Sequence, residues 1–152
     1  MKKRPPEIYF LFFLLLFVSL NALAAGWATI TNPDGSALHL TESRLSDSPF
    51  SNYLLPGVIL FLFNGVFPMA TLYGLIKKPD WSWAGSFNIY PDKHWSWACS
   101  LYSGVILIVW TTVQMFMVSY FWLQPAFVGV GLLIIIFTLL PRVMRFYSYQ
   151  GK

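Results

Sequence analysis

The charged residues of this chain are confined to a few short segments. Four long apolar stretches, residues 8–30, 54–76, 98–120 and 123–140, contain no Asp, Glu, Lys, Arg or His. A helix of ~20 residues is long enough to cross a hydrocarbon layer of roughly 30 Å. We therefore predict an all-α membrane protein with four transmembrane helices packed as an antiparallel bundle.

The composition leaves little room for anything else. Of the 152 residues, 57% are hydrophobic and only 11% are charged, whereas soluble domains average about 25% charged residues. The segments outside the four stretches are too short to build a separate soluble core. We expect one membrane domain over residues 1–152, with an outer loop at 31–53 and an inner loop at 77–97.

The first apolar stretch has two interpretations. Three basic residues precede it, and Ala22-Leu23-Ala24 resembles the cleavage site of a secretory signal peptide. However, the apolar run continues to Ile30, which makes it longer than the 7–15 residues of a signal core. Trp27 also falls where an interfacial tryptophan is expected. We favour a retained helix, with a cleaved signal peptide as the alternative.

The distribution of basic residues predicts the orientation. If the chain crosses four times, nine of its ten Lys and Arg residues fall on one side. These are Lys2, Lys3, Arg4, Lys77, Lys78, Lys93, Arg142, Arg145 and Lys152. The positive-inside rule places that side, and both termini with it, in the cytoplasm. The net charge of +4 is thereby explained by topology, and no nucleic-acid partner is expected.

The inner loop contains two copies of the tripeptide Trp-Ser-Trp, at 81–83 and 95–97. Tryptophan favours the membrane boundary because its ring prefers the apolar edge while its N–H keeps a polar partner. The neighbouring lysines favour anionic lipid. We predict that four residues anchor this loop flat in the head-group layer: Trp81, Trp83, Trp95 and Trp97.

Small residues predict where two of the helices meet. Helices in lipid associate through close packing of small side chains and through hydrogen bonds. Ala70 and Gly74 are four residues apart in the second stretch, as are Ser100 and Gly104 in the third. Both pairs lie toward the cytoplasmic half, so we predict that the second and third helices pack closely there.

A second group of residues brings polar atoms into the apolar stretches. Asn64 precedes Pro68 by four residues, where the proline ring disrupts a helix, so we expect a kink. Thr111 and Gln114 lie in the third stretch. The favoured interpretation of Asn64, Thr111 and Gln114 is hydrogen bonding between helices. The alternative is a polar pocket for a substrate or a quinone-like head group.

The sequence offers no pattern typical of catalysis. His39 and His94 lie on opposite sides of the predicted membrane, Cys99 is the only cysteine, and no metal-binding, phosphate-binding or dinucleotide-binding motif is present. No ionisable residue lies deep within an apolar stretch, which argues against a proton-coupled transporter. We expect no enzyme activity, no cofactor and no metal.

Several segments resemble small, uncharacterised four-helix proteins of the bacterial inner membrane. The segments are Ser48-Pro49-Phe50 with Tyr53-Leu54-Leu55-Pro56-Gly57, Asn64-Gly65-Val66-Phe67-Pro68, Trp110-Thr111 with Gln114, and Trp122-Leu123-Gln124-Pro125. The resemblance implies a bacterial cytoplasmic membrane and transfers no catalytic residue. We expect a non-enzymatic accessory or assembly partner, acting on another membrane protein or as a homo-oligomer within the lipid bilayer. The alternative is a binder or carrier of a small apolar or amphipathic molecule.

Overall fold

The computed structural model describes residues 3–40, 45, 48–117 and 122–149, and over these residues the chain is all-α without a strand. The long helices are α1 (Pro6–Thr31), α5 (Trp95–Met117) and α6 (Leu123–Leu139). A further continuous helix consists of α2 (Leu54–Ile59), the π-helical segment η3 (Leu60–Val66) and α3 (Phe67–Lys77). The short helices are η1 (Ser36–Leu38), α4 (Ser82–Gly85) and α7 (Pro141–Tyr147). The predicted all-α class is confirmed over these residues.

Three of the described helices are long and apolar enough to cross a membrane: α1, the continuous helix Leu54–Lys77, and α5. The fourth predicted helix is shorter. It consists of α6, which is followed by α7 after a bend of 63° at Leu140–Pro141. If this bent pair is counted as one span, the described helices include four candidate spans. The described helix ends lie close to the predicted ones, and predicted helix residues 118–120 lie outside the described part.

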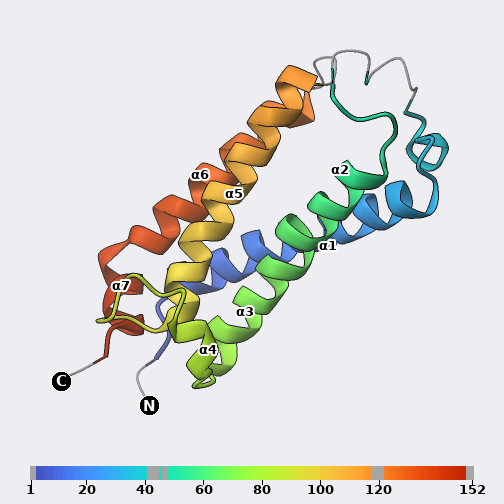
Figure 1. The fold of residues 1–152 in the computed structure, drawn as a ribbon. Coiled ribbons are helices and arrows are strands. Elements are labelled where there is room, and N and C mark those ends of the chain that lie inside the picture. The colour runs from blue at the N-terminus through green and yellow to red at the C-terminus, as the bar shows by residue number, and fades with distance from the viewer. Residues whose placement is uncertain (1–2, 41–44, 46–47, 118–121, 150–152) are drawn as a thin grey trace.

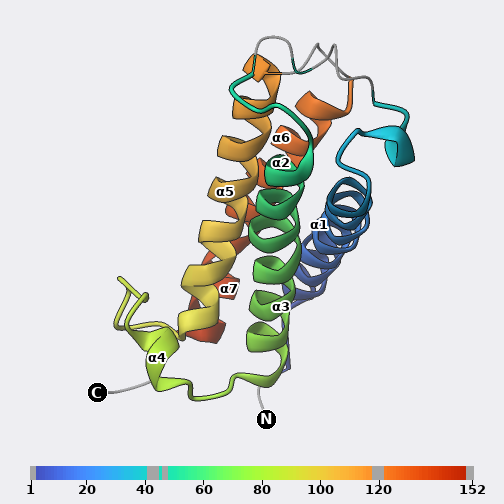
Figure 2. The same ribbon diagram turned by 45° about the vertical axis from the view of Figure 1, so that its right-hand side comes forward.

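The helices form two pairs (Figure 1). α1 packs along α2, η3 and α3, whereas α5 packs along α6. The pairs meet where α3 contacts α5 and where α1 contacts α6, and they diverge toward the end that carries the outer loop. Figure 2 shows that α7 and the start of α1 lie at the same end of the molecule as α4.

Pro68 is accommodated by a widened helix. Where a kink was predicted near Asn64, the structure has the seven-residue π-helical segment η3, which ends two residues before Pro68. The helix continues through this segment, from Leu54 to Lys77. The Ser19 hydroxyl of α1 donates a buried hydrogen bond of 2.7 Å to the Gly65 carbonyl. Hydroxyl side chains on neighbouring helices often supply such bonds beside a proline in a membrane helix.

Glycines allow close contact within each helix pair. A Cβ on Gly26 of α1 would lie 2.9 Å from the Gly57 carbonyl oxygen of α2. A Cβ on Gly104 of α5 would lie 2.9 Å from the Gly131 carbonyl oxygen of α6. Neither position has room for a larger side chain without moving backbone, so these contacts set the distance between the paired helices.

The predicted contact between the second and third helices is wrong in part. Gly74 does lie against α5, where an added Cβ would be 2.9 Å from Ser96 Cβ. Ala70 is exposed. Ser100 and Gly104 face α6 instead of α3, since the Ser100 hydroxyl lies 3.1 Å from Thr138 Oγ1 and Gly104 approaches Gly131. Spacing of four residues defines a shared helix face but not the helix that covers it.

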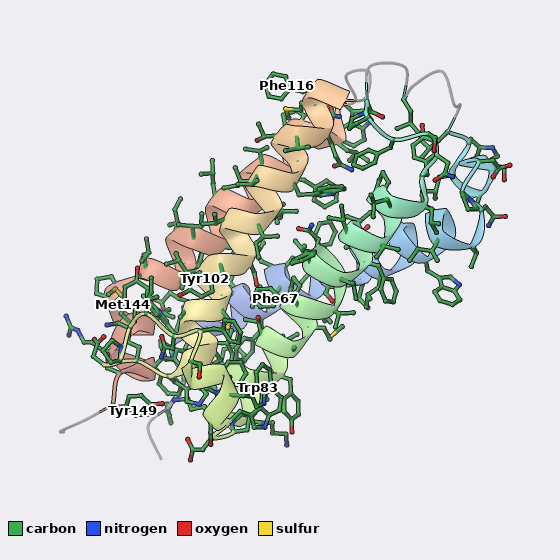
Figure 3. The ribbon with its side chains drawn as sticks, viewed as in Figure 1. Phe67, Trp83, Tyr102, Phe116, Met144 and Tyr149 are labelled. Carbon is green, nitrogen blue, oxygen red and sulfur yellow. The ribbon has the colours of Figure 1, made fainter. Side chains whose placement is uncertain are left out.

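The predicted anchors divide into two groups. Trp83, a residue of α4, is 64% exposed and projects away from that helix (Figure 3). Trp81 is half-buried, and its ring stacks on that of Trp95 with 5.1 Å between the ring centroids. Trp95 and Trp97 are buried, so their prediction as anchors is wrong. The reason is that α5 begins at Trp95, and the helix turns the second Trp-Ser-Trp into the bundle.

Indole N–H groups fix both buried rings. Trp95 Nε1 donates to the Pro79 carbonyl at 2.8 Å, and Trp97 Nε1 donates to the Thr138 carbonyl of α6 at 2.8 Å. Trp97 is only 1% exposed. The start of α5 is thus attached to the loop after α3 on one side and to α6 on the other.

The last carbonyls of α3 accept hydrogen bonds from three donors, two of which come from distant segments of the chain. The last carbonyls of a helix lack partners within it. Here the Lys78 backbone N–H donates to Gly74 O at 2.8 Å, the Tyr147 hydroxyl donates to Leu75 O at 2.9 Å, and the Arg4 guanidinium donates to Ile76 O at 2.7 Å. Positive charge at this end also complements the helix dipole.

Candidate binding cavity

A cavity of about 540 Å³ lies between the two helix pairs, on the side of the outer loop. Its volume is within the ~300–1,000 Å³ typical of small-molecule sites. Four helices, with α2 and η3 counted as one continuous helix, and the outer loop supply the wall. The lining residues include Val18, Asn21, Ala22, Ala25 and Thr29 of α1; Pro56, Gly57, Leu60 and Asn64 of α2 and η3; Leu107, Trp110, Thr111 and Gln114 of α5; and Leu123, Gln124 and Phe127 of α6.

Asn64 is the most unusual residue of this wall. It is 1% exposed, yet neither Nδ2 nor Oδ1 has a hydrogen-bond partner among the described residues. A buried polar group without a partner costs roughly 1–3 kcal/mol and is rare in native structures. Asn64 is also the lining residue of the α2–η3 helix farthest from the outer loop along the chain, which places it at the opposite end of the cavity from that loop.

Trp110 supplies a second unpaired polar atom. Its Nε1 is buried and has no hydrogen-bond partner in the described part of the chain, although its side chain lines the same cavity. Thr111, beside it in α5, is 3% exposed, and Gln114 follows one turn further on. The structure thus brings the predicted polar residues Asn64, Thr111 and Gln114 to one cavity, and no hydrogen bond joins them to one another.

The outer loop lines one end of the cavity, mostly with apolar side chains. The loop residues in this part of the wall are Leu38, His39, Leu40, Leu45, Phe50 and Tyr53. A hydrogen bond of 2.8 Å from Tyr53 N to Pro33 O joins the two ends of the loop. Gly35 has φ +80°, and an added Cβ would lie 2.8 Å from the Tyr53 ring, so only glycine fits.

Apart from His39, the described residues of the cavity wall have no carboxylic acid or basic side chain, since they include no Asp, Glu, Lys or Arg. His39 is exposed at the loop end of the cavity, whereas His94 lies at the opposite end of the molecule, in contact with Trp95 and Tyr149. The described residues contain no group of three His, Cys, Asp or Glu that would hold a metal ion. The chemistry available here is neutral hydrogen bonding and apolar contact.

The sequence of α1 carries a signal for the part of the cavity wall that this helix contributes. The buried residues of the first half of α1 are mostly Ile, Leu and Val, namely Ile8, Leu11, Leu14, Leu15 and Val18. In the second half they are Ser19, Ala22, Gly26 and Thr29. Small side chains on the inward face leave space wherever the opposite helix does not approach to fill it.

Comparison of the chain with protein-family models, with curated proteins and with solved structures found no match.

Proposed function

We propose that the chain is an integral protein of the bacterial cytoplasmic membrane with four spans and both termini in the cytoplasm. The apolar helices support a membrane location. The shared position of α7 and the start of α1 (Figure 2) suits an even number of crossings, and the basic residues suit a cytoplasmic location for that end. A reporter enzyme active only in the periplasm should be inactive when fused after Lys152 and active when inserted in the outer loop.

We further propose that the protein binds a small amphipathic molecule in the cavity between its helix pairs. The observation that carries this proposal is the Asn64 amide, which is buried, has no hydrogen-bond partner among the described residues, and belongs to the wall of a space large enough for a ligand. Apolar pockets with a few convergent polar groups are the usual form of small-molecule sites. A ligand with polar atoms would pair the hydrogen-bonding groups of the wall that no described residue pairs.

Two adjacent alanines of α1 provide a matched test. Ala25 lines the cavity, whereas Ala24 is exposed on the outside of the helix. Ala25→Phe should fill the cavity, and Ala24→Phe should add the same ring to the lipid-facing surface. The full chain and both variants would be purified from bacterial membranes in a mild detergent, and the small molecules that each retains would be identified by mass spectrometry.

The wild type and Ala24→Phe should retain a common small molecule that Ala25→Phe has lost. Thermal unfolding would establish that both variants are folded. If all three chains retain the same molecules, or none retains any, the cavity is not a binding site. Repeated recovery of one membrane protein in stoichiometric amount with all three chains, and no small molecule, would favour the accessory or assembly role instead.

A further inference from the structure

We infer that the ligand presents an uncharged, flat head group to the end of the cavity away from the outer loop, and that its ring oxygens accept hydrogen bonds when the ring is a quinone and both accept and donate them when it is the quinol. This inference rests on the proposed binding function and specifies its ligand class. Three unpaired atoms define the site: Asn64 Nδ2, Asn64 Oδ1 and Trp110 Nε1.

The head group must be neutral. The described wall offers no Lys or Arg to pair with a phosphate or carboxylate, and no Asp or Glu to pair with an amine. An unpaired charge in such an environment carries a large desolvation penalty. Amide, indole and hydroxyl groups instead match uncharged carbonyls and hydroxyls, at ordinary hydrogen-bond strength.

The pattern of donors and acceptors favours a ring that carries oxygens. Asn64 Nδ2 and Trp110 Nε1 are donors on two different helices, so they match carbonyl oxygens, and Asn64 Oδ1 matches a hydroxyl. A benzoquinone has two carbonyls, and its reduced form has two hydroxyls. A fatty alcohol has one hydroxyl and leaves part of this set unpaired. The faces of Trp110 and Phe127, both in the wall, suit contact with a flat ring.

The position of these atoms also orients the ligand. Asn64 lies at the end of the cavity away from the outer loop, whereas the loop side chains at the other end are mostly apolar, Leu38, Leu40, Leu45 and Phe50 among them. The ligand therefore lies with its head toward the middle of the helices and its apolar tail toward the loop. This is the reverse of a phospholipid in the outer half of a bilayer, whose head group faces water.

The test compares two probes with the same tail. The full-length protein in lipid nanodiscs would be titrated with a benzoquinone carrying a ten-carbon alkyl chain, and with a benzene ring carrying the same chain. Isothermal titration calorimetry would measure binding. The wild type should bind the quinone roughly tenfold or more tightly than the plain ring, since each hydrogen bond contributes up to about one order of magnitude.

Asn64→Leu should remove most of that preference, leaving only the share contributed by Trp110. The matched control is Thr112→Val, because Thr112 is exposed and its hydroxyl bonds to Ile108 O of its own helix; this variant should retain the preference. Ala25→Phe should bind neither probe. Thermal unfolding would show that each variant is folded, and Trp110→Phe would provide a second variant that should lose part of the preference.

Each other result has a defined meaning. Equal binding of both probes by the wild type would overturn the head-group inference while leaving the cavity as a site for apolar molecules. Quinone preference retained in full in Asn64→Leu would overturn the assignment of Asn64. A charged lipid identified in the purified wild type and lost from Ala25→Phe would contradict the neutral head group but uphold the proposed function.

Discussion

The two ends of the molecule pair their buried polar side chains to different extents. At the end that holds α4 and α7, indole N–H groups, a tyrosine hydroxyl and a guanidinium each reach a backbone carbonyl of another segment. Glu7 Oε2 and His94 Nε2, at the same end, lack a described partner, but both side chains are bonded through their other polar atom. In the half beneath the outer loop, the helix pairs diverge (Figure 1) and the polar atoms of Asn64 and Trp110 have no described partner.

This difference separates the part of the fold that maintains structure from the part that is available for binding. Paired polar groups in an apolar interior stabilise one arrangement, while unpaired ones cost stability unless something else satisfies them. The contrast predicts that equivalent substitutions will have different magnitudes, and in one case different signs, at the two ends.

Loss of Trp97 should give the largest effect. Trp97→Ala removes a ring that is 1% exposed and its hydrogen bond to α6, and should cost about 3 kcal/mol, or roughly 10 °C in Tm. Thermal unfolding in a mild detergent would measure the change. The control, Trp83→Ala, alters a ring that is 64% exposed and should change Tm little. Equal effects of the two substitutions would remove the distinction between buried and surface tryptophans.

Asn64→Leu should change stability in the opposite direction. The substitution removes a buried amide with no described partner and places an apolar side chain beside a cavity that has room for it. We expect a gain of about 1 kcal/mol in unfolding free energy, measured for the ligand-free protein. A loss of stability would mean that the Asn64 amide has a structural role, and the contrast between the two ends would fail.

Tyr147→Phe should have an effect of similar size but destabilising. It removes only the hydroxyl that donates to Leu75 O, and should cost about 1 kcal/mol, since the carbonyl at the end of α3 then loses its partner. Tyr149→Phe is the control because Tyr149 is 52% exposed. Hydrogen exchange of the α3 amides should rise in Tyr147→Phe alone, and unchanged exchange would count against the capping role.

The smallest expected effect concerns pH. Burial lowers the pKa of His94, and the positive charge of Lys78 lowers it further. Between the ordinary pKa of 6.5 and the lowered value in the folded protein, the unfolded chain binds more protons. Stability should therefore fall as pH falls below about 6.5, and should not depend on His94 above it.

His94→Asn would isolate this contribution. Asn can still accept a hydrogen bond from Ser96 N at the start of α5, as His94 Nδ1 does at 3.3 Å, but it does not titrate. The Tm of the variant should vary less between pH 7 and pH 5 than that of the wild type, whereas His39→Asn, at an exposed position, should match the wild type. An unaltered slope in His94→Asn would exclude His94 as its source.

The sequence predicted the helices better than their contacts. The absence of charge in a stretch is a property of that stretch alone, so the positions of α1, α5 and the helix Leu54–Lys77 follow from it. The role of each Trp-Ser-Trp depends on distant partners. Trp97 is buried because the Thr138 carbonyl accepts its N–H across 41 residues of sequence, and nothing local distinguishes it from Trp83.

The sequence predicted three polar residues of the candidate site but not the cavity that they line. A polar side chain in an apolar helix is visible in the sequence, which is why Asn64, Thr111 and Gln114 were found together. The cavity depends on how far the helix pairs diverge and on the outer loop that lines one end of it. Trp110 was missed as a polar group because a tryptophan inside an apolar stretch is most simply interpreted as packing.

The π-helical segment η3 has a consequence for insertions and deletions in this chain. A π-helix holds one more residue per hydrogen-bonded turn than an α-helix, so removing one residue from Leu60–Val66 would restore the narrower geometry. The α-helix turns through about 100° per residue and the wider π-helix through less, so the shortened segment would still cover nearly the same total rotation. Gly57 would therefore keep facing Gly26, whereas removal of one residue from α3 before Gly74 would rotate Gly57 by about 100° relative to the contact of Gly74 with α5. The chain should accordingly tolerate the loss of one residue better within η3 than within α3.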